Sequence, residues 1–264
     1  MKKIKSNSLV FLCFVLAFTS CTKVIKIDLN KSDPKIVIEG SLTDQSSSCE
    51  VKLTKTINYD QSNVFPTVSG AAVNISDNFG NTASLIETQP GIYTAPSFTG
   101  VPGRVYTLSV TVDGKTYTAI SGMNSVTPID TLLQSTGGFS ESTLISAVFN
   151  DYPGIENYYR FVAETNGKMS TAIMVQDDKL RDGSVIEQEL DGIEDLKTGD
   201  TVLVYLQAID KSVYNYLNTL KDLAGGGGGI GGSATLANPV SNVTGGALGF
   251  FSAYTVKSKQ IVIQ

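Results

Sequence analysis

Carboxylates are the side chains most able to carry chemistry in this sequence, because none of its 264 residues is a histidine. Without an imidazole, Ser-His-Asp and Cys-His nucleophile arrangements are excluded, as are the common histidine-bearing zinc sites. The segment 176–200 contains nine acids and three bases. Enzymes based on carboxylates, lysine or bound calcium are the classes that remain.

The acidic segment can be interpreted in three ways. Calcium takes six to eight oxygen ligands, which suits carboxylates, but the spacing fits no EF-hand loop and a solvated hairpin explains the charge equally well. Two carboxylates about 5–10 Å apart could hydrolyse a glycosidic bond, and alternation along "VIEQEL" places Glu187 and Glu189 on one face of a strand. No substrate cleft is evident, so we expect no catalytic residue, no metal, no cofactor and no enzyme activity. The acids considered are Asp177, Asp178, Asp182, Glu187, Glu189, Asp191, Glu194 and Asp195.

Aromatic residues beside a glycine-rich segment are the better candidates for binding. Phe250, Phe251 and Tyr254 follow the Gly-rich segment 225–246, and exposed aromatics near such a loop often contact a partner, although a domain core uses the same residues. The glycine run itself has no following Lys-Ser or Lys-Thr pair, and a helix ends in it, which argues against a phosphate loop. Cys49 is expected to be a small residue at a strand edge.

The N-terminus predicts export and a lipid anchor. Three lysines precede the apolar run 9–18, which is too short to cross a bilayer of about 30 Å as a helix. Basic, apolar and small-residue regions in this order make a secretory signal at 1–20. Cys21 stands where a bacterial lipoprotein signal places its lipidated cysteine, and 21–33 would be the tether. The alternative is an ordinary signal with a free thiol left nearby.

Charge and cysteine count limit the partners. Removal of residues 1–20 takes away three lysines and no acid, which leaves 17 basic and 25 acidic residues and a net charge of −8. Such a charge disfavours nucleic acid as a partner. Cys13 would leave with the signal and Cys21 would carry lipid, so no intrachain disulfide is expected.

Alternating apolar residues and turn signals predict a mostly β chain in two parts. Residues 34–123 contain at least six short strands, including a hairpin at Asp113-Gly114, and favour an immunoglobulin-like β-sandwich. Residues 124–264 are expected to form a second β-rich domain, which contains a hairpin at Asn166-Gly167. One amphipathic helix is expected near 210–223, capped by Asp210, and its apolar face should pack on the second sheet.

Several stretches together resemble a family of Bacteroidota outer-membrane lipoproteins known as a domain of unknown function (DUF4249). They are "VIKIDL" with "PKIVIEG", "VSGAAVNISDNFGN", "GVPGRVYTLSVTVDGKTYTA", "NYYRF" and "NPVSNVTGGALGFFSAYTV". The resemblance covers essentially the whole mature chain. It implies a lipoprotein of the outer membrane whose gene tends to lie beside a TonB-dependent receptor, and it supplies no catalytic residues.

We therefore expect a cell-envelope protein attached to the outer membrane by a lipid on Cys21. Its function would be to bind a ligand or to assist a TonB-dependent transporter, with Phe250, Phe251 and Tyr254 as partner-binding residues. Surface adhesion or assembly is the alternative, because edge strands can pair with other chains. A carboxylate-based hydrolase is a third. No acid precedes Asp28 after the cysteine, so the sequence leaves open which face of the membrane the protein occupies.

Overall fold

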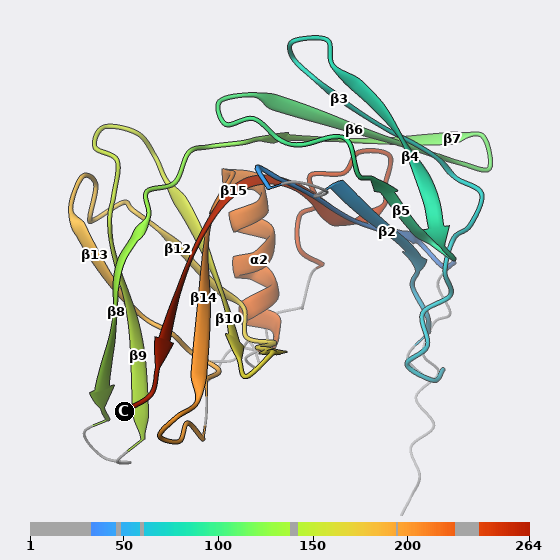
Figure 1. The fold of residues 1–264 in the computed structure, drawn as a ribbon. Coiled ribbons are helices and arrows are strands. Elements are labelled where there is room, and N and C mark those ends of the chain that lie inside the picture. Colours follow the sequence, from blue (N-terminus) through green and yellow to red (C-terminus); the bar gives the residue numbers. More distant parts are fainter. Residues whose placement is uncertain (1–32, 46–48, 59–60, 138–141, 194, 225–237) are drawn as a thin grey trace, which may run out of the picture. The chain divides into compact units, whose positions relative to one another are not determined.

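The computed structural model describes residues 33–45, 49–58, 61–137, 142–193, 195–224 and 238–264 (Figure 1). The predicted signal, Cys21, the tether and residues 225–237 of the Gly-rich segment lie outside these ranges. The described chain is mostly β with a single helix, which confirms the predicted fold class. In the first half the strands are β1 (Ile36–Thr43), β2 (Cys49–Lys55), β3 (Ala72–Asp77), β4 (Thr82–Gln89), β5 (Ile92–Ala95), β6 (Val105–Val112) and β7 (Lys115–Gly122).

The described residues of the second half form eight strands and the helix. The described helix falls within one residue of the predicted bounds at both ends. The elements of the second half are β8 (Ile129–Thr136), β9 (Thr143–Asn150), β10 (Tyr158–Thr165), β11 (Lys168–Met169), β12 (Met174–Asp177), β13 (Val185–Glu189), β14 (Thr201–Ile209), α2 (Lys211–Ala224) and β15 (Leu248–Val262).

Twelve strands form one continuous sheet in the order β11-β10-β14-β15-β1-β2-β5-β4-β3-β6-β7, with β12 paired to β10. Along β4 the pairing changes from β3 to β5. Apolar residues of β1, β2 and β5 share one core with those of β3, β6 and β7, so the two parts of the sheet pack face to face in a sandwich-like arrangement. Alternating burial in β6 shows the inward face directly.

The second half of the chain forms a second sandwich-like arrangement of two packed sheets. The strands β13, β9 and β8 form a separate three-stranded sheet. Its apolar side packs on the inner face of β10 and β14, where Phe149, Phe161 and Leu206 are almost fully buried in a common core. Phe149 and Phe161 pack with their ring centroids 5.8 Å apart.

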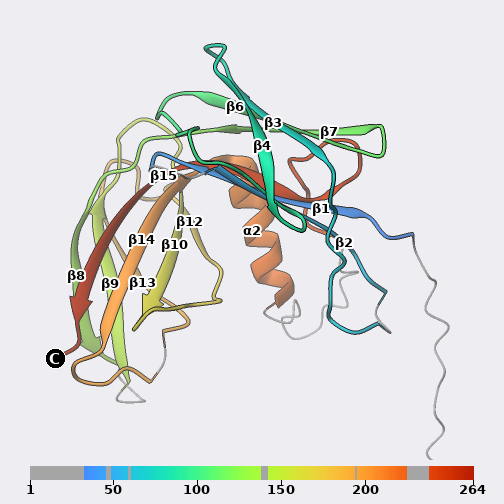
Figure 2. The same ribbon diagram turned by 45° about the vertical axis from the view of Figure 1, so that its right-hand side comes forward.

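The last strand runs from one part of the large sheet into the other, as Figures 1 and 2 show. Residues 248–254 of β15 pair in parallel with β1, and residues 255–262 pair antiparallel with β14. The two cores meet in the sequence between Met123 and Val126, close to the boundary expected at 124, while Phe251 and Ala253 of β15 belong to the first core.

Local sequence explains the turns and the helix start. At the β6–β7 turn Asp113 and Gly114 have φ of 50° and 78°, and at the β10–β11 turn Asn166 and Gly167 have φ of 49° and 83°. These are the two-residue hairpins that the sequence predicted. Asp210 Oδ1 accepts the backbone N–H groups of Ser212 at 2.8 Å and of Val213 at 3.0 Å, which confirms it as the N-cap of α2.

The apolar side of α2 packs on the outer face of the β10–β14–β15 part of the large sheet, as expected. Val213 and Leu217 are buried against Tyr158 of β10 and Ile209 of β14. Within the described residues, no helix is long and apolar enough to cross a membrane.

Candidate functional site

The three predicted partner-binding aromatics do not share a face. Phe250 and Tyr254 point to the α2 side of β15, where both are half-buried. Phe251, between them, is 0 % exposed in the first core. Adjacent strand residues point to opposite faces, so Phe251 is wrong as a partner-binding residue and is a core residue. The structure leaves Phe250 and Tyr254 as candidates.

Phe250 and Tyr254 lie on a sheet surface beside α2 that also carries polar groups. Cross-strand register places Tyr158 opposite Ile209 and Arg160 opposite Gln207. Because alternate residues share a face, these side chains point to the same side of the sheet. We call this surface the helix-side face and define it by Tyr158, Arg160, Gln207, Ile209, Phe250, Ser252 and Tyr254.

Three polar groups on the helix-side face have no partner among the described residues. The Arg160 guanidinium makes no hydrogen bond and no ion pair with any described group. Burial lowers its pKa. Gln207 Oε1 and Ser252 Oγ are buried and accept or donate no hydrogen bond. Buried polar groups are normally satisfied, so each of these three calls for a partner.

The nearby acids are already engaged. Glu39 of β1 pairs with Lys52 at 3.5 Å. Asp44 Oδ1 accepts the backbone N–H of Val256 at 3.0 Å and a side-chain N–H of Gln45 at 3.0 Å. Arg160 is therefore left as an unpaired cation in this part of the described chain.

Aromatic rings of β10, β15 and α2 pack together on this face. Tyr216 of α2 packs on Phe250 with ring centroids 5.0 Å apart, and Tyr158 packs on Tyr214 at the same distance. Burial raises the pKa of Tyr216 and of Tyr254, so both phenols stay neutral donors at physiological pH. An arginine near the neutral Tyr254 phenol can bind a carboxylate or another planar anion, whereas the orphaned Gln207 Oε1 only accepts hydrogen bonds and needs a donor.

Sequence reasoning missed Arg160, Gln207 and Ser252. For Arg160 and Gln207 the available signal was a charged or polar residue inside an apolar strand, "NYYRF" and "TVLVYLQAI" respectively. Periodicity predicts that such a residue lies on one face, but only the cross-strand register shows that Arg160 and Gln207 are neighbours.

The acidic segment separates into different environments. Glu187 and Glu189 are on one face of β13 and both are exposed, as the alternation predicted. Asp191 and Asp195 are exposed and border two adjoining hollows of about 500 and 550 Å³. Asp178 instead lies 3 % exposed in a group with Asp151 and Asp182.

Cys49 is a buried free thiol at the start of β2, 2 % exposed. Burial raises its pKa to about 12, which keeps the sulfur protonated and unreactive. This supports the structural role expected for it.

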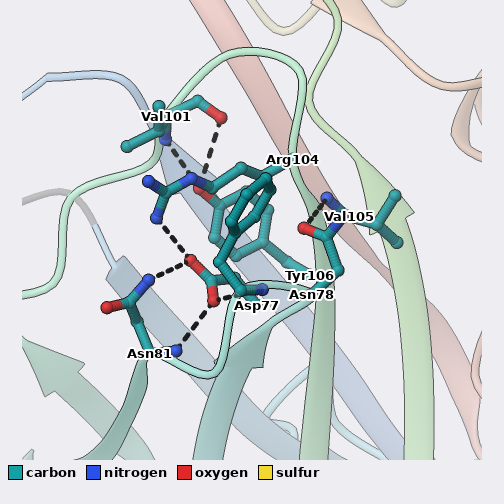
Figure 3. A network of polar contacts seen from close by, with 8 residues as sticks. Asp77, Asn78, Asn81, Val101, Arg104, Val105 and Tyr106 are labelled. Carbon is teal, nitrogen blue, oxygen red and sulfur yellow. Dashed lines mark hydrogen bonds and ion pairs between the residues drawn. The ribbon is translucent and has the colours of Figure 1, made fainter.

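A separate polar network closes the β3–β4 turn, as Figure 3 shows. Asp77 binds Arg104 at 2.6 Å and accepts bonds from the Phe79 backbone, at 3.0 Å, and from the Asn81 backbone and side chain, at 2.8 and 2.7 Å. The Asp77 carboxylate has a cation and three further donors. We therefore assign this network to turn stability and not to binding.

The fold and the helix-side face together define a mostly β, sandwich-like protein with one described helix and a partly unsatisfied polar surface. The chain matches the family model described as "Domain of unknown function (DUF4249)" over residues 22–260. It therefore belongs to that family, which confirms the resemblance at the family level. No curated protein matches the chain.

Proposed function

We propose that this chain is a lipid-anchored cell-envelope protein that binds a partner through the helix-side face, without catalysis. The observation that carries the proposal is that the Arg160 guanidinium, opposite Gln207 in the strand register, has no hydrogen bond or ion pair with any described residue. An unpaired cation with neighbouring unsatisfied groups is costly in a protein that binds nothing there. A carboxylate supplied by a partner would satisfy Arg160 through paired hydrogen bonds.

We propose a TonB-dependent outer-membrane transporter as that partner. The proposal rests on the family resemblance, which implies receptor genes as neighbours, and on the need for an anionic group at Arg160. A carboxylate on a receptor loop has the required chemistry. The chain itself, with a mature net charge of −8, would then meet its partner at a local positive site.

Affinity purification with an Arg160→Met variant tests the binding proposal. Methionine keeps the length of the side chain and removes an unpaired charge, so the fold should be as stable as before or more stable. Wild-type protein should retain a TonB-dependent receptor from native membranes, and the variant should lose at least about tenfold of it, the equivalent of about 1.4 kcal/mol.

The matched control is Lys168→Met, which removes a positive charge from the exposed β10–β11 hairpin. It should leave the yield of receptor unchanged. Equal retention by wild type and Arg160→Met, or capture of unrelated proteins alone, would contradict the proposal. A deletion that tests the Gly-rich segment should be limited to residues 225–237. Asn242, which follows them, should be kept, because its Nδ2 donates to Phe251 O at 2.8 Å and helps to hold β15.

The anchor has its own test. Cys21→Ala should move the protein from the membrane fraction to the soluble fraction, and the wild-type protein should carry acyl chains at Cys21 by mass spectrometry. Two or three chains give stable attachment, whereas one does not. A variant that stays with the membrane would overturn the anchor but would leave the helix-side face to be tested separately.

Assembly through strand edges is the second candidate. The observation that favours it is β8, which among the described strands pairs only with β9 and exposes Leu133 by 42 %. Lys259 Nζ donates to the backbone carbonyls of Ile129 and Asp130. Gln264 bonds to the Gln134 side chain. The remaining backbone groups of this edge can pair with another chain. Concentration-dependent oligomers that a Leu133→Lys variant abolishes would support this function, and a monomer at all concentrations would contradict it.

A further inference from the structure

The connection between β2 and β3 exposes a short apolar segment. Val64 is 73 % and Phe65 is 53 % exposed, and Pro66 beside them is exposed as well. Single exposed apolar residues are common on a protein surface, but a run of three consecutive ones normally has a function. We call residues 61–67 the Phe65 loop.

Backbone hydrogen bonds hold the Phe65 loop against the end of β2. Lys55 N donates to Pro66 O at 2.8 Å, and Thr54 forms an isolated antiparallel bridge with Thr67. These contacts fix the backbone directly after Phe65. The two exposed apolar side chains are therefore carried on a segment that is held outside the core.

The chain enters the first sheet at the same end. The Lys35 carbonyl, directly before β1, accepts the backbone N–H of Thr56 at 2.9 Å, and Lys35 N donates to Thr56 Oγ1 at 2.9 Å. Figures 1 and 2 show that the connection from β2 to β3 projects from the sheet where β1 begins. The Phe65 loop therefore lies at the end of the sheet that receives the chain from the predicted anchor.

The predicted tether keeps this end of the sheet near the bilayer. A chain of 13 residues, the length of 21–33, spans at most about 47 Å. A second contact made by an already anchored protein is an intramolecular event with a high effective concentration. Two apolar side chains can then hold a contact with lipid that would be too weak in a free protein.

The charges around the Phe65 loop fit a lipid surface. Residues 61–71 contain no charged side chain, so no charge has to leave water when the loop enters the bilayer interface. Lys35 and Lys55 lie beside the loop and form no ion pair within the described chain, which leaves both cations available to lipid phosphates. Glu87, which contacts residue 70, already accepts two backbone N–H groups.

We propose that Val64 and Phe65 insert into the interface of the bilayer that holds the anchor, at the boundary between headgroups and acyl chains. The inference rests on the proposed lipid at Cys21, which brings the loop to the membrane. Insertion removes both apolar side chains from water. Attachment through one residue leaves the orientation of the protein free, whereas this second contact restricts it.

Tryptophan fluorescence tests the contact, because the chain contains no tryptophan. The lipidated Phe65→Trp variant is reconstituted into vesicles of phosphatidylethanolamine and phosphatidylglycerol that carry bromine on the acyl chains as a quencher. Emission from position 65 should shift to shorter wavelength and be quenched. Bromine near the headgroups should quench more than bromine at the chain ends, because interfacial groups lie only about 5–10 Å deep.

Phe79→Trp is the matched control. Phe79 is 70 % exposed in the turn after β3, and the six residues of β3 separate this turn from the Phe65 loop by about 20 Å along the strand. Emission from position 79 should escape quenching. Equal quenching at both positions, or none at position 65, would overturn the proposal, and a shift at position 65 without quenching would indicate a protein contact and overturn it as well.

A charge on the loop gives a second variant. Val64→Asp in the Phe65→Trp background should lose the quenching, because a carboxylate resists transfer out of water. Val185→Asp, at a valine that is 63 % exposed on β13, should keep it in the same background. Quenching that persists in Val64→Asp, or that is lost in both variants, would contradict the contact.

Flotation of the vesicles separates this inference from the anchor on which it rests. Wild-type protein should float with the vesicles, and Cys21→Ala should not. Unquenched emission from a floating Phe65→Trp variant would refute the loop contact and leave the anchor standing. Wild-type protein that fails to float would overturn both.

Discussion

At the residue scale, the clearest structural requirement is Gly249, which pairs with Ile38 near the start of the contact between β15 and β1. Gly249 has φ of +92°, and a Cβ added to it would lie 2.1 Å from Ile38 O. Backbone strain and a clash with a backbone atom act together at this position. Ile38 belongs to β1, the strand near the start of the described chain that pairs with β15 near its end.

We predict that Gly249→Ala lowers the free energy of unfolding by roughly 2–4 kcal/mol. Urea denaturation followed by circular dichroism measures it. The control is Gly122→Ala in β7, where an added Cβ meets no atom within 4 Å and φ is not in the left-handed region. That variant should change stability by less than about 0.5 kcal/mol, and equal losses in the two variants would refute the steric explanation.

Two carboxylates should make the protein sensitive to acid. Burial alone would raise the pKa of Asp77, but hydrogen bonds from Asn81, Arg104 and Phe79 lower it from 3.8 to about 2. Backbone N–H groups of Gly70 and Gly91 lower the pKa of Glu87 from 4.5 to about 2. Because both values are lower in the folded state, their stabilisation is complete above about pH 4.5 and is lost as the pH falls toward 2.

An Asp77→Asn, Glu87→Gln double variant should therefore be less stable at pH 7, and its stability should fall less between pH 4.5 and pH 2 than that of wild type. Denaturation midpoints across this range measure both effects. The control Glu50→Gln, an exposed position on β2, should keep the wild-type slope. Parallel curves for the double variant and wild type would contradict the assignment.

At the element scale, the start of α2 depends on the N-cap residue Asp210, which directly precedes the helix. Asp210 caps the helix and also accepts a hydrogen bond from Ser121 Oγ of β7. Ser121 Oγ in turn accepts Ala253 N of β15 at 3.0 Å. The cap thus connects the helix with strands from both halves of the chain.

We predict that Asp210→Ala costs about 1–2 kcal/mol of stability. Asp222→Ala, in the last turn of α2, is the control. Removal of the Asp222 carboxylate should leave the stability unchanged or raise it slightly, because an acid near a helix C-terminus interacts unfavourably with the helix dipole. Thermal melts of the two variants decide the matter, and a larger loss in Asp222→Ala would refute the capping account.

Local sequence signals were enough to predict the elements but not their partners. The hairpins at Asp113-Gly114 and Asn166-Gly167, the helix cap and the alternation in "VIEQEL" depend on neighbouring residues, so a single sequence predicts them. The parallel pairing of β15 with β1 joins residues more than 200 positions apart in the chain. No spacing rule contains that information. Alternation predicts that Phe250 and Phe251 point to opposite faces, but only the pairing shows that Phe251 is the one buried in the first core.

The same limit applies to the functional groups. Arg160 is visible as a charge in "NYYRF". That no described residue pairs with it depends on the strands and the helix around it, which the sequence does not show. Asp151 and Asp178 are 27 positions apart and meet only because β9 and β12 end near each other. The sequence shows the acidic segment 176–200. In the fold, Asp178 and Asp182 of this segment lie together with Asp151, which is outside it.

At the scale of the whole molecule, β15 is the connection on which the architecture depends. Its first seven paired residues extend the first sandwich-like unit and its last eight extend the second. The helix-side face lies along this strand, where Phe250, Ser252 and Tyr254 alternate with core residues of the first sandwich-like unit. A partner bound there would contact residues whose strands belong to both cores.

The central claim is that this family member presents the helix-side face to a partner at the membrane. Photo-cross-linking in living cells measures it most directly, with a benzoylphenylalanine in place of Tyr216 and, as control, in place of Phe79, which is 70 % exposed on the β3–β4 turn. The account predicts one discrete membrane-protein adduct from position 216, lost in an Arg160→Met background, and none from position 79. An adduct from position 79 alone, or one from position 216 that persists without Arg160, would contradict it.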